Sequence, residues 1–240
     1  MRAAHRAVLV AAAVGAELRN HGCPNLRFLK HTGLNVTCVR LARPHRAKRC
    51  LLDGVAALAR SWRSSSMLQV GAHLAFGNAN DPFKRLALDV INHTVLVEPQ
   101  PGVYRDLAAL VAAHADPAHR IAVVNRAVSD RDGVVTFHTI NDTLIDPATG
   151  CYRRGFEPPP GGKACPASFT SQIASLSLKN ILKHKHWIPN LKALVVDVEV
   201  RASTVRTLLD EHDLRDDLVV LSVDAEGHDQ IIVRSVDLSK

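Results

Sequence analysis

Short apolar runs alternate with helical patterns from residue 67 onward, and this alternation constrains the fold more than any other feature. Four runs are predicted to be buried strands because each is short and aliphatic: residues 67–71, 94–97, 121–124 and 218–223. Segments with helical spacing or capping signals lie among them: residues 82–92, 101–115 and 203–212. We expect Asp81 and Ser203 to cap the first and the last of these helices.

Strands that are apolar along their whole length belong to parallel sheets covered on both faces. Because parallel crossovers are right-handed, the expected fold class is α/β with a doubly wound, Rossmann-like sheet. An Asp-Gly turn at Asp132 and Gly133 predicts one additional strand, at residues 134–138. In such sheets ligands bind at the carboxyl ends of the strands, so the residues that follow each strand are the candidates for function.

Three of these positions suggest a nucleoside-binding site. Gly71 ends the first run, where a glycine allows close approach of a ligand, although a glycine in a plain tight turn gives the same pattern. Glu98 follows the second run, 21 residues after Gly77, and an acidic residue there can accept hydrogen bonds from both ribose hydroxyls. Asn125 follows the third run, where a polar group would meet an adenine edge. The three glycines of a dinucleotide site are missing, which disfavours an NAD(P)-dependent oxidoreductase.

Ionisable residues crowd the end of the fourth run, in the segment DAEGH. Asp224, Glu226 and His228 are the candidate catalytic residues, because neighbouring ionisable groups acquire separated pKa values that suit acid and base work. The alternative for Glu226 is a favourable contact with the N-terminus of a helix starting there. No metal site is predicted, although Asp224 and Glu226 carry the oxygen ligands that hard cations use.

The positive charge of the chain is confined to its beginning. Residues 1–66 hold 12 Lys and Arg against 2 Asp and Glu, a net of +10, whereas residues 67–240 hold 18 against 21, a net of −3. Aromatic residues are only 4% of the chain, so few side chains could stack on bases. These two features argue against a nucleic-acid partner.

The first 16 residues have the layout of a secretory signal peptide. Two arginines precede ten residues of Ala, Val, Leu and Gly at 7–16, a run too short to span a bilayer. A transit peptide or an ordinary first helix remains the alternative, so localisation is predicted as secretory or extracellular, with an organellar or cytoplasmic place as the other option. Residues 17–66 form a basic extension with one helical stretch near 51–62 and a linker at 64–66.

Five cysteines are present, and none forms a C-x-x-C pair, so zinc is not expected. Cys151 and Cys165 bracket a loop rich in Pro and Gly and are the natural pair if the compartment is oxidising. Five reduced thiols are the equal alternative.

Several of these segments together resemble the FkbM family of S-adenosylmethionine (SAM)-dependent methyltransferases. They cover about residues 67–240: LQVGA, NDPF, VLVEPQP with VYRDL after it, VVNRAVSDRDGVVTF, SQIASLSLKNILKH, VRASTVRTLLDEHDL and LVVLSVDAEGHDQIIVRSVDLSK. The resemblance implies a class I methyltransferase fold, SAM as the methyl donor, and O-methylation of a hydroxyl on a sugar, glycolipid or related small molecule. It places the cofactor contacts at Gly71, Ala72, Gly77, Glu98, Asn125 and Ala127.

The turn after the first run departs from the family pattern of Gly-Ala-Asn, one further residue and Gly. Here His73 follows Ala72, and Gly77 comes two residues late. This departure keeps a second function open, that of a catalytically silent protein of this fold which binds a glycan or a protein partner. The oligomeric state is not predicted.

Two further expectations concern the end of the chain and its long loop. A class I methyltransferase sheet has seven strands, so the resemblance implies a sheet truncated after the fourth core strand, with residues 218–223 as an exposed edge. The stretch 140–169 is too long for a plain connector and is predicted to be a loop on the acceptor side.

Overall fold

A computed structural model of the chain describes residues 56, 59–60, 64–75, 83–114, 116, 118–146, 149–155, 157, 165, 170–188 and 190–236. The predicted signal peptide at 1–16, most of the predicted extension at 17–66, Gly77 and Asp81 lie outside these residues.

Four parallel strands form the central sheet: β1 (Ser66–Val70), β2 (His93–Val97), β3 (Arg120–Val124) and β7 (Leu218–Val223). Their order is β3-β2-β1-β7, and every neighbouring pair is parallel. All four predicted strands are confirmed, three of them starting one residue earlier than expected. The protein is therefore α/β with a parallel sheet, and the strand order is compatible with a Rossmann-like fold.

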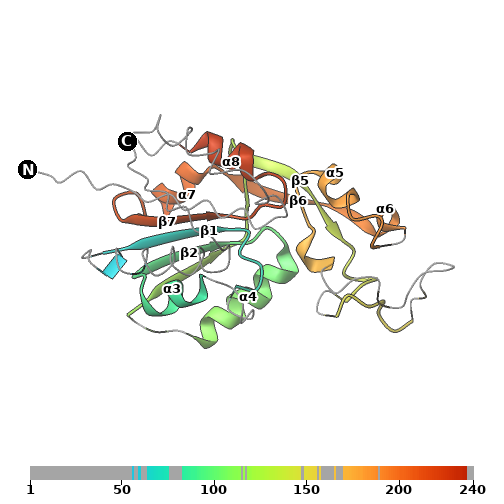
Figure 1. Cartoon of the computed structure of the whole chain (residues 1–240), viewed down its shortest axis with the longest axis horizontal. Coiled ribbons are helices and arrows are strands. Elements are labelled where there is room, and N and C mark those ends of the chain that lie inside the picture. The colour runs from blue at the N-terminus through green and yellow to red at the C-terminus, as the bar shows by residue number, and fades with distance from the viewer. Residues whose placement is uncertain are drawn as a thin grey trace, which may run out of the picture.

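Helices cover both faces of this sheet (Figure 1). On one face lie α3 (Lys84–Asp89) and α4 (Pro101–Ala113), and on the other lie α7 (Val205–Glu211) and α8 (Asp229–Ser235). In β1, β2 and β3 neighbouring side chains enter the two cores in turn, whereas Val219 and Val220 of β7 both enter the first. The first core includes Met67, Leu86, Leu96 and Leu107. The second includes Leu68, Val95, Leu208 and Ile232.

The strand β7 stands at one end of the described sheet and pairs with β1 there. All six of its side chains are buried. The predicted edge position of residues 218–223 is thus observed among the described residues, while the side chains of β7 are covered because they pack in the two cores on either face of the sheet.

The predicted linker at 64–66 is wrong. Ser65 and Ser66 are buried, and Ser66 is the first residue of β1. The amide and the hydroxyl of Ser65 both donate to Asn92 Oδ1, each at 3.1 Å, which ties this segment to the start of β2. Ala56 and Ala59 are helical, as expected near 51–62, and they pack in the first core.

A second sheet lies beside the first and contains β4 (Ala127–Val128), β5 (Gly133–Ile140) and β6 (Val195–Ser203). Its order is β4-β6-β5, with β6 parallel to β4 and antiparallel to β5. The strand expected at 134–138 is confirmed and extends to Ile140. The strand β6, its principal partner, was not predicted.

Short helical segments pack at the far end of this second sheet: η1 (Thr170–Gln172), α5 (Leu178–Leu182) and α6 (Leu191–Leu194). Ile140 ends β5 and Ile145 is buried in their core, so part of the stretch predicted as a loop at 140–169 belongs to this packed unit. A disulfide joins Cys151 to Cys165, as expected for an oxidising compartment.

Three helices begin later than predicted, and the first of them is α3, which was expected over residues 82–92 and spans Lys84–Asp89. Ser203 is the last residue of β6, and Thr204 caps α7 instead. The helix expected from Glu226 begins at Asp229, because Glu226 and Gly227 have positive φ angles of 45° and 92°, which a right-handed helix cannot contain.

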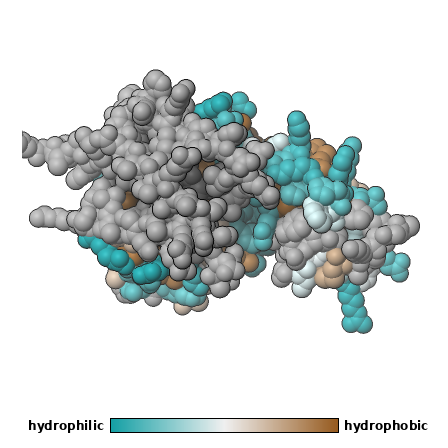
Figure 2. All heavy atoms as spheres, viewed as in Figure 1, coloured by the Kyte–Doolittle hydropathy of each residue, from teal (hydrophilic) through white to brown (hydrophobic). Residues whose placement is uncertain are grey.

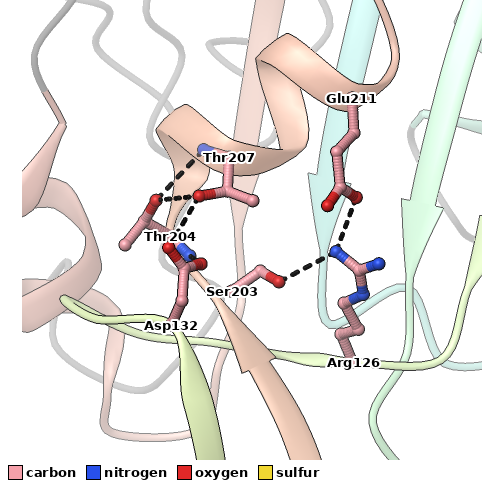
Figure 3. A network of polar contacts seen from close by, with 6 residues as sticks. All are labelled: Arg126, Asp132, Ser203, Thr204, Thr207 and Glu211. Atoms are coloured by element: carbon pink, nitrogen blue, oxygen red, sulfur yellow. Dashed lines mark hydrogen bonds and ion pairs between the residues drawn. The ribbon is translucent and has the colours of Figure 1, made fainter.

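A polar network fixes the start of α7 against the turn before β5 (Figure 3). The Thr204 hydroxyl accepts from the Thr207 amide at 3.0 Å. The Asp132 carboxylate accepts from the Thr204 amide and from the Thr207 hydroxyl, both at 2.9 Å. Beside it, Arg126 donates to the Ser203 hydroxyl at 3.0 Å and pairs with Glu211 at 2.6 Å. The network joins the second sheet to a helix of the first.

We expect Thr204→Ala to lower the free energy of unfolding by about 1 kcal/mol, because the helix loses its capping acceptor. Thr204→Ser retains the hydroxyl, so its free energy of unfolding should fall by no more than about half of the loss expected for the alanine variant. Urea unfolding of both variants measures the difference. Equal stabilities of the alanine and serine variants would contradict the capping role.

Candidate functional site

The carboxyl ends of β1, β2 and β7 meet at one edge of the central sheet. The amides of Gly71 and Ala72 both donate to the Val97 carbonyl at 3.0 Å, and the Asp224 amide donates to the Val70 carbonyl at 3.0 Å. Three of the predicted site segments are therefore brought together, as the parallel topology requires.

The conformation of Gly71 has a structural cause. Its φ is +72°, and a Cβ placed there would lie 1.8 Å from the Asp224 carbonyl oxygen. The close approach is thus between β1 and the backbone after β7, whereas the sequence suggested an approach to a ligand. Ala72 is 2% exposed and its side chain packs in the first core, so only its backbone borders the site.

Glu98 is a buried carboxylate at the end of β2. One carboxylate oxygen accepts from the His73 amide at 2.9 Å and the other from the Gln100 amide at 2.8 Å. Burial raises the pKa of Glu98 from 4.5 to about 7, and the two amides offset part of that rise. His73 reaches this carboxylate with a φ of +45°, an unfavourable conformation for a residue other than glycine.

Asn125 joins the ends of β2 and β3. Its side-chain amide donates to the Glu98 carbonyl at 2.8 Å and to the Pro99 carbonyl at 3.0 Å. It lies at the strand ends as predicted, where it positions the segment that carries Glu98. Ala127 is in β4, and its side chain packs in the core of the second sheet rather than among these residues.

The three candidate catalytic residues after β7 have different neighbours. Asp224 lies beside Gly71, through its backbone contact with Val70. Glu226 is in a left-handed conformation, and its carbonyl accepts from the Ser175 hydroxyl at 2.7 Å and from the Asn180 side chain at 2.5 Å. The structure therefore directs Glu226 toward the second sheet and α5.

His228 is the third of these residues and forms the N-cap of α8. Its Nε2 lies 3.1 Å from the Ser129 hydroxyl. Ser129 also donates to Asp130 at 3.1 Å. Burial lowers the pKa of His228, partly offset by Asp130 and Asp229, so the imidazole is neutral over a wider pH range than a solvent-exposed histidine.

Ser175 and Asn180 were missed as site residues. Both lie in a segment that carried the family resemblance, but they follow no strand of the central sheet. The rule that selects residues after those strands could therefore not find them.

Within the described residues no group of three or more His, Cys, Asp or Glu side chains could hold a metal ion. Over the same residues, no helix is both long and apolar enough to cross a membrane. Comparison with family models, curated proteins and solved structures finds no match to this chain.

Proposed function

We propose that the protein is a SAM-dependent methyltransferase that methylates a hydroxyl on a sugar, glycolipid or related small molecule. The observation that carries the proposal is the buried carboxylate of Glu98 at the carboxyl end of β2. It stands at the strand end where a nucleoside-binding α/β protein has its ribose acceptor, between Asn125, which follows β3, and the Gly71 turn after β1.

The hydrogen-bond acceptor positions of Glu98 suit the two hydroxyls of a ribose. Each Glu98 oxygen accepts one backbone amide, and a carboxylate oxygen has two acceptor positions, so with respect to the described residues one position on each oxygen remains for a hydroxyl. Two hydroxyl donors would favour the charged form of Glu98 and bring its raised pKa down. The adjacent oxygens of the carboxylate match the adjacent hydroxyls of a ribose.

When bound, SAM supplies an electrophilic methyl group. The residues after β7 then have to orient the acceptor and take up the proton of its hydroxyl. We assign this proton to the Asp224 carboxylate, because Asp224 lies beside Gly71 at the shared edge of the sheet. Glu226 contacts Ser175 and Asn180 instead, and His228 Nε2 is already engaged with Ser129.

A catalytically silent protein that binds a glycan or a partner is the second candidate. One observation favours it: Glu98 is only 3% exposed, so a ribose reaches it only if the residues covering it give way. Under this proposal SAM binding is absent while the folded protein still binds its partner.

The disulfide between Cys151 and Cys165 favours the proposed secretory or extracellular location, because disulfides persist mainly in oxidising compartments.

Calorimetry with SAM and with NAD tests the proposal on the wild-type chain. We expect SAM to bind and NAD not to bind. Glu98→Gln should weaken SAM binding by about 1–3 kcal/mol, a factor of about 5 to 150, because the charge-assisted hydrogen bonds to the ribose are lost.

Glu199→Gln is the matched control, since Glu199 is exposed on β6 and should leave the affinity unchanged. Folded wild-type protein that does not bind SAM would refute the proposal. Incubation with labelled SAM and a panel of glycans then identifies the acceptor.

A further inference from the structure

One long stretch of the sequence contains no acidic residue. Between Glu157 and Asp197 there is no acidic residue and there are five lysines, whereas the rest of residues 67–240 holds 13 Lys and Arg against 21 Asp and Glu. The lysines are Lys163, Lys179, Lys183, Lys185 and Lys192. Such segregation creates a local positive field on a domain that is otherwise acidic.

Lys179 and Lys183, each two residues from Ile181, lie on the outer side of α5 and its C-terminal end. Ile181 and Ile188, seven residues apart, are fully buried and fix the inner side. The winding continues beyond α5, since the amide of Ile188 donates to the His184 carbonyl at 3.2 Å. The other side therefore faces solvent. Four of the lysines are exposed, all in described positions: Lys179, Lys183, Lys185 and Lys192.

Trp187 stands among these lysines and is 62% exposed. Within the described residues it is the only aromatic among the exposed large hydrophobic side chains. Its ring lies 5.0 Å from that of His186, which is also exposed. Figure 2 shows hydrophilic side chains standing out from this part of the surface next to a hydrophobic patch. Burial, and then the charges of Lys183 and His186, lower the pKa of His184, in keeping with a gathering of cations.

This surface is continuous with the candidate site. Lys183 Nζ donates to Asn180 Oδ1 at 2.7 Å, and Asn180 Nδ2 donates to the Glu226 carbonyl. The contact is tight, because a Cβ on Gly227 would lie 2.7 Å from Asn180 Cγ. The helix α5 is thus held directly against the turn that follows β7.

We propose that the exposed side of residues 179–192, here called the Trp187 surface, binds an acidic carbohydrate chain and delivers it, past the turn at Glu226 and Gly227, to Asp224 at the end of β7 as the methyl acceptor. The indole ring stacks on the apolar face of a sugar, and the lysines pair with carboxylate or sulfate groups along the chain. The role of this chain as methyl acceptor rests on the proposed methyltransferase function, whereas its binding to the Trp187 surface needs no SAM.

The chemistry of the surface favours a carbohydrate over other anionic partners. A bilayer would need a larger apolar face than one tryptophan supplies. Single-stranded nucleic acid is held by several aromatic side chains on which successive bases stack. Among the described Phe, Trp and Tyr side chains, Trp187 is the only one that is exposed. One flat ring among separated cations fits a chain in which apolar sugar faces alternate with anionic groups.

Binding of defined polymers by the full chain tests the proposal. The probes are heparin for sulfate and polygalacturonate for carboxylate, with dextran as the uncharged control. We expect saturable binding of at least one acidic polymer, weakened by salt. Trp187→Ala and the triple variant Lys183→Gln, Lys185→Gln, Lys192→Gln should each raise Kd about tenfold or more. Arg206→Gln removes an exposed cation of α7 and should change Kd less than about twofold.

The basic residues 1–66 could bind the same polymers without help from this surface. The location of the binding site is therefore tested by comparing the Kd values of the Trp187 and lysine variants with that of the wild type. Trp62→Phe leaves Trp187 as the single tryptophan, because the chain has two. Its fluorescence should change on addition of the acidic polymer and stay constant with dextran.

Unchanged Kd in the Trp187 and lysine variants would overturn the proposal. So would tighter binding to single-stranded DNA or to phosphatidylserine vesicles than to both acidic polymers, with the same dependence on Trp187. If the polymers bind as expected but SAM does not, the binding surface stands and the methyltransferase function falls.

Discussion

Replacing Gly71 by alanine is expected to destabilise the protein by about 2–5 kcal/mol or to prevent its folding. The new Cβ would lie 1.8 Å from the Asp224 carbonyl oxygen and 2.8 Å from its carbon. Because these are backbone atoms after the neighbouring strand, no side-chain rotation relieves the clash, and β1 and β7 must separate. The φ of +72° adds a conformational penalty for any L-residue with a Cβ. Urea unfolding and yield of soluble protein measure the effect.

Gly102→Ala is the matched control for this prediction. Gly102 lies in the first turn of α4, and a Cβ there would meet Asp142 Oδ2 at 3.6 Å, an ordinary contact. Since alanine favours a helix over glycine, this variant should be as stable as the wild type or more stable by up to about 1 kcal/mol. A Gly71→Ala protein within about 1 kcal/mol of the wild type would contradict the close approach of the two strand ends.

Raising the pH from 5 to 8 should remove about 3 kcal/mol of stability through Glu98 alone. Its pKa is about 7 in the folded protein, against an ordinary value of 4.5. Between these values the folded state keeps a proton that the unfolded state has released, so the free energy of unfolding falls as pH rises, and the loss is complete above the folded pKa. The cause is burial of the carboxylate at the end of β2.

The comparison with Glu98→Gln isolates this contribution, because the glutamine side chain does not titrate. Burial lowers the pKa of several histidines, including His73, His93 and His228, and their effect on stability runs the other way. These histidines are present in both proteins and cancel in the difference. We expect the stability of the wild type minus that of the variant to drop by about 3 kcal/mol between pH 5 and pH 8. A constant difference over this range would show that Glu98 is ionised throughout and would contradict the prediction. Bound SAM should make the pH-dependent loss of stability smaller.

The candidate site was only partly predictable. Residues at the ends of β1, β2 and β7 could be selected because parallel strands place their carboxyl ends at one edge, and Gly71, Glu98 and Asp224 lie there. The partners of Glu226 and His228 could not, because Ser175, Asn180 and Ser129 reach them from segments 51, 46 and 99 residues away in the chain. No pattern of neighbouring residues in the sequence predicts contacts between segments so far apart.

The four central strands could be predicted from the sequence, because each is a nearly continuous apolar run, and such runs are typical of a parallel sheet covered by helices on both faces. The sequence also contained the signal for β6, where Val196, Val198 and Val200 alternate with charged residues, a pattern typical of a half-buried strand. The reason why residue 71 is a glycine is visible only in the folded chain, since the atom that a Cβ would meet is the carbonyl oxygen of Asp224, 153 residues later. The tertiary structure likewise decided that Glu98 is buried and half-protonated near pH 7, because the pKa depends on what covers the carboxylate and not on its neighbours in sequence.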